Sequence, residues 1–283
     1  MTTELSIPPT LDSRRFRRRA LACFKSQVDT MDPAIIRSWS WAVPGFGTAS
    51  AWLEDHPLRV RSGRYMSDTP GKEVWCVKLP ERFESRKVVC KYHEDENRSL
   101  YGLFHHSTAV LEAANFAALS ALGIPVPTVL ACGEKRHFGE LVSSFIITDF
   151  IDNTVDGSIL LPTGDWCDRK RLRMGFCHKC MEYIARAHAA GFHHAAFHAH
   201  KILMPKNSDE DNPEVTLIDL AHGRFRPLRS MRQAIASDLV TLFTELRLTS
   251  DEIYVLSQHY LAVNKQCAMD VDELWDAMNK LPL

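Results

Sequence analysis

The feature that most constrains the fold of this chain is a change of pattern near residue 152, from short strand-like segments to long helical ones. Before that point, runs of β-branched and aromatic residues are bounded by turn residues, which is typical of strands. One run at 107–122, with apolar residues at helical spacing and Gly123 as its stop, interrupts them. We therefore predict an antiparallel sheet with one helix, whose strands are expected at 58–60, 73–79, 87–92, 128–132 and 143–150.

After residue 152 the pattern is mainly helical. A long amphipathic run at 169–190 ends at Gly191, a residue type that commonly ends helices. Two short strands at 201–204 and 215–218 are expected to form a hairpin, with the acidic stretch 207–212 as its turn. Further helices are expected at 231–246, 250–263 and 271–280. The fold class that follows is α+β, with a sheet half and a helical half.

Length and composition narrow the class of protein further. A chain of 283 residues can form one two-lobed unit or two separate domains, and we expect an extension at 1–50, a sheet part at 51–152 and a helical part at 153–283. No window approaches the roughly 18 apolar residues of a membrane helix. The formal net charge of −1 gives no overall attraction to nucleic acid. The eight cysteines are scattered among apolar residues, which favours a reducing compartment, the cytoplasm.

One local basic segment stands out from this balanced charge. It contains Arg14, Arg15, Arg17, Arg18 and Arg19, and neither a long apolar run nor a small-residue cleavage pattern follows it. Two interpretations stay open: a solvated basic helix, or a segment that docks on anionic phosphate or lipid headgroups at the inner membrane.

A lysine within an apolar strand is the first candidate for chemistry. Lys91 lies in the run Val88-Val89-Cys90-Lys91-Tyr92, where its ammonium needs an anionic partner to offset desolvation. Glu112, on the helix that follows, is the candidate partner. Such a pair orients a lysine towards nucleotide phosphates in kinases, although either residue taken alone would be read as surface charge.

Four ordered blocks turn this pattern into a specific resemblance, which covers roughly residues 86 to 262. They resemble the lipopolysaccharide kinases, the WaaP, Kdo kinase and InaA-like group, whose fold is protein-kinase-like. The first block joins the helix to a buried strand, the second resembles a helix with its catalytic loop, the third a metal-binding segment, and the fourth the start of the next helix. Their sequences are ALGIPVP at 121–127 with Gly133, Glu134 and SFIITD at 144–149, IARAHAAGFHHAAFHAHKIL at 184–203, LIDLAHGR at 217–224, and SDL at 237–239.

The resemblance implies a sugar kinase that uses ATP and Mg²⁺. It would transfer the γ-phosphate to a hydroxyl of a heptose or Kdo sugar, on the lipopolysaccharide core or a lipid-linked glycan. It assigns Lys91, Glu112, Asp149 and Ile151 to nucleotide binding and Asp219 to the metal. The protein would then work in the cytoplasm, at the inner membrane surface.

The catalytic loop departs from the family pattern at Ala196, which stands where the family has the aspartate that orients the acceptor hydroxyl or accepts its proton. Lys201 stands where Kdo kinases have a magnesium-binding asparagine, a position at which the WaaP branch also departs from asparagine. His194 matches the loop histidine, which braces the loop, and His188 matches a position that packs near it. Two explanations of Ala196 stay open: a natural pseudokinase that acts as a nucleotide- or glycan-binding scaffold in envelope biogenesis, and a replacement of aspartate made in an active kinase.

Other chemistries have weaker support in the sequence. The Cys177-x-x-Cys180 spacing matches half of a zinc site, but no second pair stands at a suitable distance, so packing of both thiols within a helix is the prediction. The Gly-x-Ser-x-Gly motif of a serine hydrolase is missing from the sequence. A glycine-rich phosphate loop is also hard to find, because 61–64 and 70–72 are poor versions of it.

Overall fold

The computed structural model describes residues 38–42, 63–69, 71–79, 85–94, 106–137 and 140–281, with the backbone alone at 38–42, 67–69, 135–137 and 140. The described residues fall into two units, one of strands with most of one helix and one that is mainly helical. Within these ranges, no helix combines the length and the apolar character needed to cross a bilayer. The expected strand at 58–60 and the arginines of 14–19 lie outside the described residues.

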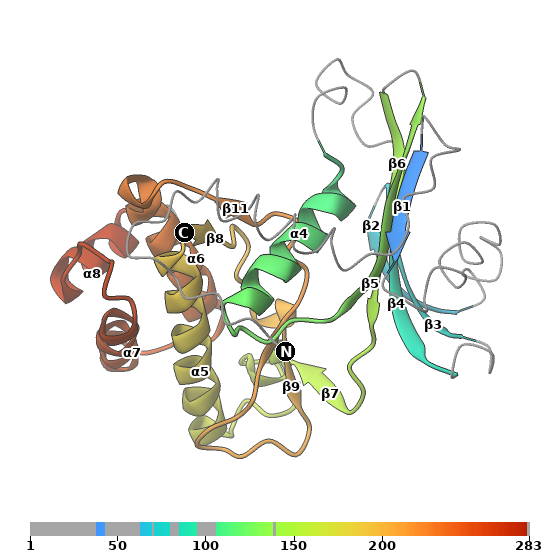
Figure 1. Ribbon diagram of the computed structural model, residues 1–283. Helices are drawn as coiled ribbons and strands as arrows, with labels where there is room; N and C mark the ends of the chain where they lie inside the picture. The colour runs from blue at the N-terminus through green and yellow to red at the C-terminus, as the bar shows by residue number, and fades with distance from the viewer. Residues whose placement is uncertain are drawn as a thin grey trace. The chain divides into compact units, whose positions relative to one another are not determined.

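The first unit is built on a six-stranded antiparallel sheet in the order β1-β5-β6-β4-β3-β2 (Figure 1). Four of its strands are β3 (Lys72–Lys78), β4 (Lys87–Glu94), β5 (Val129–His137) and β6 (Glu140–Asp149), which confirms the expected strands in this region. The remaining two are β1 (Ser38–Ala42) and β2 (Arg64–Thr69). The buried side of the sheet gathers small and branched apolar side chains, namely Val77, Leu79, Val88, Cys90, Leu130, Ala131 and Ile147.

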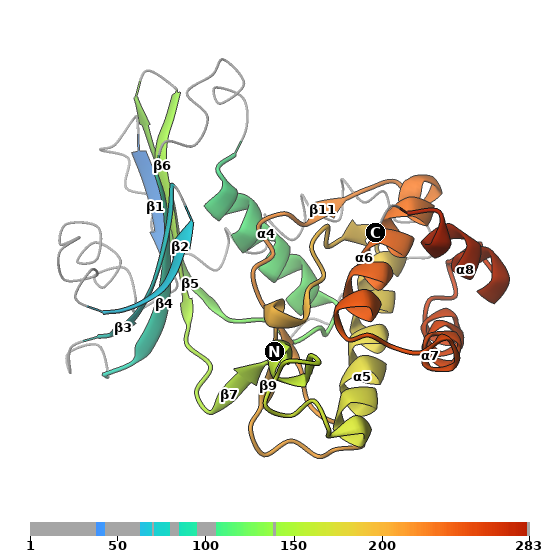
Figure 2. The same cartoon turned by 180° about the vertical axis from the view of Figure 1, so that it is seen from behind.

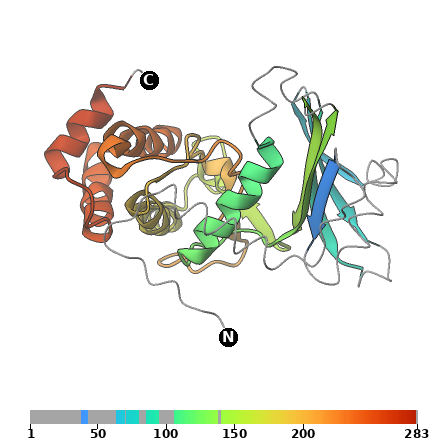
Figure 3. The same ribbon diagram turned by 45° about the horizontal axis from the view of Figure 1, so that its top comes forward.

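Strand β1 was not expected, because it lies inside the segment interpreted as an extension. It pairs with β5 over its whole length, with Trp39 opposite Glu134 and Trp41 opposite Cys132, and forms one edge of the sheet (Figure 3). Its sequence, Ser-Trp-Ser-Trp-Ala, alternates small polar and aromatic residues with a period of two, which is the pattern of a strand with one buried face.

Helix α4 (Thr108–Ala121) confirms the one helix expected in the sheet half. At its start the Ser107 hydroxyl accepts a hydrogen bond from the amide of Val110 at 3.3 Å. At its end Gly123 adopts a φ of +69°, and the amide of Ile124 donates to the carbonyl of Leu119, so the glycine closes the helix as predicted.

The second unit contains α5 (Lys170–Ala189), α6 (Met231–Glu245), α7 (Ser250–Val263) and α8 (Val271–Asn279), each within two residues of its expected bounds. Helix α7 packs on α5, and α8 packs on α6 and α7 (Figure 2). Capping boxes at Thr249 and Asp270 begin α7 and α8.

Short strands complete this unit. The expected hairpin forms from β9 (Ile202–Pro205) and β10 (Thr216–Leu217), and β7 (Thr154–Asp156) adds to it in the order β10-β9-β7. A second pair joins β8 (Phe192–His193) to β11 (Arg224–Phe225). These two small sheets flank the segments that carry Ala196 and Asp219.

The acidic stretch between β9 and β10 does more than turn the chain. Glu210 and Asp211 pair with Arg169 and Arg171 at the start of α5. A Cβ atom at Gly175 would lie 2.3 Å from the carbonyl oxygen of Glu210. The glycine therefore permits a close approach of this connection to α5.

Candidate functional site

In the sheet unit, Lys91 and Glu112 form the ion pair that the sequence predicts. Lys91 lies in β4 and Glu112 in α4, and Nζ lies 2.6 Å from Oε1. The Glu112 side chain is 0% exposed and that of Lys91 is 13% exposed, so the pair is almost free of water screening. The second carboxylate oxygen of Glu112 is buried without a hydrogen bond among the described residues. Glu112 therefore depends on Lys91 for its charge compensation, and the lysine is held in one orientation.

Glu134 fixes the helix that carries Glu112. This buried side chain accepts a hydrogen bond from the backbone amide of Ser107 at 2.7 Å, just before the first residue of α4. A carboxylate at a helix N-terminus also interacts favourably with the helix dipole. The Gly133-Glu134 pair of the first motif block thus has a positioning role within this unit.

Asp149 and Ile151 follow at the end of β6. The Asp149 carboxylate binds the Arg86 guanidinium through both oxygens, at 2.5 Å and 2.7 Å. Its backbone amide donates to Thr128. Ile151 is half-buried. The side chain of Asp149 is therefore engaged by Arg86.

The two weak phosphate-loop candidates are only partly covered by the described residues. Residues 61, 62 and 70 lie outside them. Thr69 faces Lys72 in antiparallel register, and Gly71, which precedes β3, has a φ of +75°.

In the helical unit, Asp238 of α6 organises the start of the loop that contains Ala196. Its Oδ2 atom accepts a hydrogen bond from the amide of His194 at 2.8 Å, and Oδ1 accepts one from the amide of Ala195 at 2.9 Å. The ring of His188 lies 3.1 Å from Oδ2 and 2.9 Å from the Tyr260 hydroxyl on its other side. Burial acts to raise the pKa of the Asp238 carboxyl, but the His188 hydrogen bond and the neighbouring histidines lower it overall. The carboxylate form is thus the one that holds the loop.

Glu245, the last residue of α6, was not among the candidate residues predicted from the sequence. Its carboxylate accepts a hydrogen bond from the amide of Ala199 at 2.8 Å and lies 2.6 Å from Nδ1 of His198. Asp238 and Glu245 are seven residues apart, so they lie on the same side of α6. Helix α6 therefore holds the loop at two points, before and after Ala196.

Two residues of this region adopt left-handed backbone conformations. Ala195 has a φ of +65° and Asp219 a φ of +56°. Such conformations are costly for residues with a Cβ atom and cluster at functional sites. Ala196 itself is half-buried, and its carbonyl accepts a hydrogen bond from the amide of His198.

Lys201 and Asp219 form an ion pair. Nζ of Lys201 lies 3.2 Å from Oδ2 of Asp219, and the side chains are 10% and 20% exposed. The amide of Ile218 donates to the Lys201 carbonyl, which ties the two segments together beside the pair. The structure thus brings together Asp219, the residue expected at the metal site, and Lys201.

His194 is fully buried between aromatic rings. Its ring centroid lies 5.3 Å from that of Phe197 and 6.5 Å from that of Phe192. Both ring nitrogens are buried without a hydrogen bond in the described structure. Burial lowers the pKa of His194 to about 4, and nearby Lys201 acts in the same direction. These surroundings suit a neutral His194 ring that packs against the rings of Phe192 and Phe197.

This environment predicts a pH-dependent stability. Because the folded pKa of about 4 lies below the ordinary value of 6.5, His194 destabilises the fold as pH falls from 6.5 towards 4, by about 3 kcal/mol in full. His194→Phe should remove this loss and leave stability at pH 7 unchanged or higher, since it removes two unsatisfied ring nitrogens. Urea denaturation of both proteins at pH 7 and pH 4.5 measures the difference. Equal pH dependence in both would contradict the assignment.

The cysteine pair is confirmed as packing. Cys177 and Cys180 are both 0% exposed within α5, and burial raises the pKa of Cys177 to about 12. A thiol with so high a pKa is a poor metal ligand at neutral pH, because the thiolate is the ligating form.

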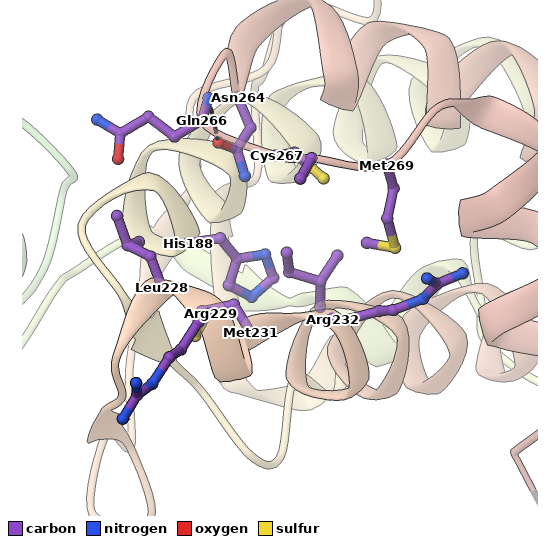
Figure 4. A pocket seen from close by; sticks show the side chains of 11 residues that line it. His188, Leu228, Arg229, Met231, Arg232, Asn264, Gln266, Cys267 and Met269 are labelled. Carbon is purple, nitrogen blue, oxygen red and sulfur yellow. Dashed lines mark hydrogen bonds between the residues drawn. The ribbon is translucent and has the colours of Figure 1, made fainter.

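A cavity of about 220 Å³ lies in the helical unit, beside His188 (Figure 4). The ring of His188 reaches it, and Met231 and Met269 contribute apolar walls. The side chains of Arg229 and Arg232 point away from its centre in this view. His188 is the one residue of the predicted constellation that lines it.

Comparison with known proteins agrees with this arrangement. The family model described as lipopolysaccharide kinase (Kdo/WaaP) matches residues 91–260. A solved structure described as WaaP in complex with acyl carrier protein is similar, with a TM-score of 0.58 and 18% identity over 89% of this chain and 96% of that one. The PknI kinase domain of Mycobacterium tuberculosis is more distant, with a TM-score of 0.44 and 16% identity over 77% of this chain and 93% of that one. The comparison with curated proteins found no match.

The antiparallel sheet with one helix, followed by a mainly helical part, defines a protein-kinase-like α+β fold. The family match extends over more than half of the chain, from Lys91 in β4 to Tyr260 in the last turn of α7. The chain belongs to the lipopolysaccharide kinase (Kdo/WaaP) family.

Proposed function

We propose that this protein is an ATP-dependent sugar kinase whose phosphate transfer is impaired by alanine at position 196. The acceptor would be a heptose or Kdo hydroxyl of the lipopolysaccharide core or of a lipid-linked glycan. The buried Lys91–Glu112 pair is the observation that carries the proposal, because Glu112 is buried beyond any surface role and holds the ammonium in place. In kinases such a lysine binds the nucleotide phosphates.

The residues of the chain fit the nucleotide well. Lys91 supplies a fixed positive charge for phosphate oxygens, and Glu134 holds the helix of its partner. By resemblance to the family, the segment with Asp149 and Ile151 at the end of β6 would contact the base. The Asp149 carboxylate is engaged by Arg86 and its amide by Thr128, so the base would meet other backbone groups of this segment. ATP, when bound, supplies the phosphoryl group that is transferred.

The donor set fits magnesium less well. Family membership implies use of Mg²⁺, which prefers several oxygen ligands and is commonly held by one or two carboxylates with substrate phosphates. Asp219 supplies one carboxylate, and its charge is already opposed by Lys201 at 3.2 Å. The amide oxygen found at the Lys201 position in Kdo kinases is replaced by a cation. Asp219 alone does not complete a magnesium site.

The acceptor side explains the expected impairment. The loop around Ala196 is held by Asp238 and Glu245, so its backbone is arranged to position a catalytic side chain. A methyl group neither orients a hydroxyl nor accepts its proton, and positioning is a large part of phosphoryl-transfer catalysis. The proposed acceptor and the basic sequence at 14–19 support a proposed site of action in the cytoplasm, at the inner membrane surface.

The test of nucleotide binding uses Lys91→Met. We expect ATP binding, measured by isothermal titration calorimetry, to weaken about 10- to 100-fold because a charge-assisted contact to phosphate is lost. Lys91→Met/Glu112→Gln is measured beside it, since it removes the buried carboxylate charge together with the ammonium. Lys78→Met, an exposed lysine at the end of β3, is the matched control. ATP binding that is equal in all four proteins, or missing from the unaltered chain, would rule out the ATP site.

A second function is favoured by the Lys201–Asp219 pair. With its metal-site aspartate neutralised by an internal cation, the protein could hold a nucleotide or a phosphorylated glycan without transferring phosphate. It would then be a pseudokinase that serves as a scaffold or regulator in envelope biogenesis. Phosphate transfer by an Ala196→Asp variant separates the two functions, because a kinase would gain transfer and a scaffold would not.

A further inference from the structure

Two histidines and a glutamate gather where the loop after Ala196 meets the end of α6. His198 and His200 come from the loop, and Glu245 is the last residue of α6. One potential ligand atom from each side chain lies within 4.8 Å of the other two. Among the described residues, this is the one set of three histidine, cysteine or acidic side chains arranged in this way.

The backbone holds these three side chains together before any ligand is bound. The Glu245 carboxylate is tied to the loop by the amide of Ala199, between the two histidines. The rings of His198 and His200 are stacked, with centroids 5.2 Å apart and an angle of 20° between their planes. A short 3₁₀ turn at Ala199–Lys201 fixes the spacing of the two rings. The cost of ordering the ligands is thus partly met by the fold.

We propose that His198, His200 and Glu245 form a binding site for a divalent transition ion of the zinc type. Two imidazole nitrogens with one carboxylate oxygen form a ligand set that zinc accepts, with a fourth position left to water. In such a site each ligand atom lies about 2 Å from the ion, so the three ligand atoms lie about 3.3 Å from one another. The His198–Glu245 contact of 2.6 Å must therefore open slightly, while the His200 nitrogen, now within 4.8 Å of the other two atoms, adjusts to the same separation. The exposed ring of His200 can make this movement by rotating its side chain, and it leaves the site open to solvent.

The same ligand set disfavours Mg²⁺, the cation that family membership implies. Magnesium prefers oxygen ligands and octahedral geometry, whereas imidazole suits zinc, copper and nickel. The proposed site is separate from Asp219 and stands independently of the proposed kinase function. A bound ion would join the loop after Ala196 to the end of α6 more firmly than the present His198–Glu245 contact of 2.6 Å.

Zinc alone is the probe for this site. The full chain, without an affinity tag, is titrated with Zn²⁺ in competition with a chromophoric chelator, and the expected result is one tight equivalent per chain. His200→Ala should weaken this binding at least about tenfold, because the loss of a ligand costs no less than the loss of a supporting hydrogen bond. This variant is the sharpest, since it leaves both contacts of Glu245 with the loop in place. Glu245→Gln should weaken binding too.

The controls separate this site from other zinc ligands. His178→Ala is matched, because His178 also faces a second histidine, His259, with ring centroids 4.9 Å apart, but belongs to no such set of three. It should bind zinc as the unaltered chain does. Mg²⁺ at the same concentration should not compete. Zinc binding that survives in His200→Ala, or no tight equivalent in the unaltered chain, would overturn the site.

Discussion

Ala196→Asp is expected to raise ATP-dependent phosphate transfer to core oligosaccharide by on the order of 10²-fold or more, because a positioned base contributes about this much to proton transfer. The loop is already held on both sides of residue 196, by Asp238 at Ala195 and by Glu245 at Ala199. Position 196 is half-buried, so a carboxylate there keeps contact with water and its burial costs little. The new side chain would therefore be carried by a loop whose backbone is already held in place.

The measurement compares three proteins at equal ATP and acceptor concentrations. Ala196→Asn is the matched control, since asparagine has the size of aspartate but cannot accept the proton. A gain in the aspartate variant alone would mean a kinase scaffold that lacks one base. A gain in both variants would mean that size and orientation matter, and proton transfer does not.

Lys201 limits the phosphate-transfer activity that Ala196→Asp can restore. Its ammonium opposes the Asp219 carboxylate at 3.2 Å, and aspartate at 196 does not change that pair. Ala196→Asp/Lys201→Asn restores the amide oxygen of the Kdo kinases and should give more transfer, with a stronger dependence on Mg²⁺. If ATP binds to every variant and none transfers phosphate, the scaffold function replaces the kinase function.

Sequence patterns predicted the elements in which local signals agree. Helices α4 and α5 combine apolar spacing with a glycine stop, and the β-branched and aromatic runs of β4 and β6, bounded by turn residues, favour buried strands. Strand β2 was missed because Arg64–Thr69 is largely polar. β2 is one of the two edge strands of the sheet. It buries fewer side chains than a central strand, so its sequence shows a weaker apolar pattern.

The contacts of the candidate site also fall into those that the sequence predicts and those that it does not. The Lys91–Glu112 pair could be predicted because an ammonium in an apolar strand demands a partner, and the helix that follows offers one. The pairings of Glu245 with His198 and of Lys201 with Asp219 could not be predicted. They join residues 47 and 18 positions apart through the packing of α6 and the hairpin, and no spacing rule links such residues. A charged residue that ends a helix, as Glu245 does, is ordinarily read as solvated.

Asp238→Ala should lower the free energy of unfolding by about 3–5 kcal/mol, the range for removing one partner of a buried charge network. The carboxylate is 1% exposed, and it satisfies the amides of His194 and Ala195 and one ring nitrogen of His188. The amide of His194 and the ring nitrogen of His188 would be left buried without an acceptor, at about 1–3 kcal/mol apiece before the loop relaxes, whereas Ala195 is exposed and its amide loses less. Such a loss is a large share of the stability of an ordinary domain.

Asp238→Asn keeps the experiment informative if the alanine variant does not fold. Its amide has one acceptor oxygen in place of two, so one of the two backbone amides loses its partner, and the expected loss is about half as large. Asp276→Ala, an exposed position of α8, should change stability by less than about 0.5 kcal/mol. Urea denaturation at pH 7 measures all three. If Asp238→Asn is as stable as the unaltered chain, the loop does not depend on this carboxylate, and the backbone around Ala196 must be held in place chiefly by Glu245 and by aromatic packing against His194.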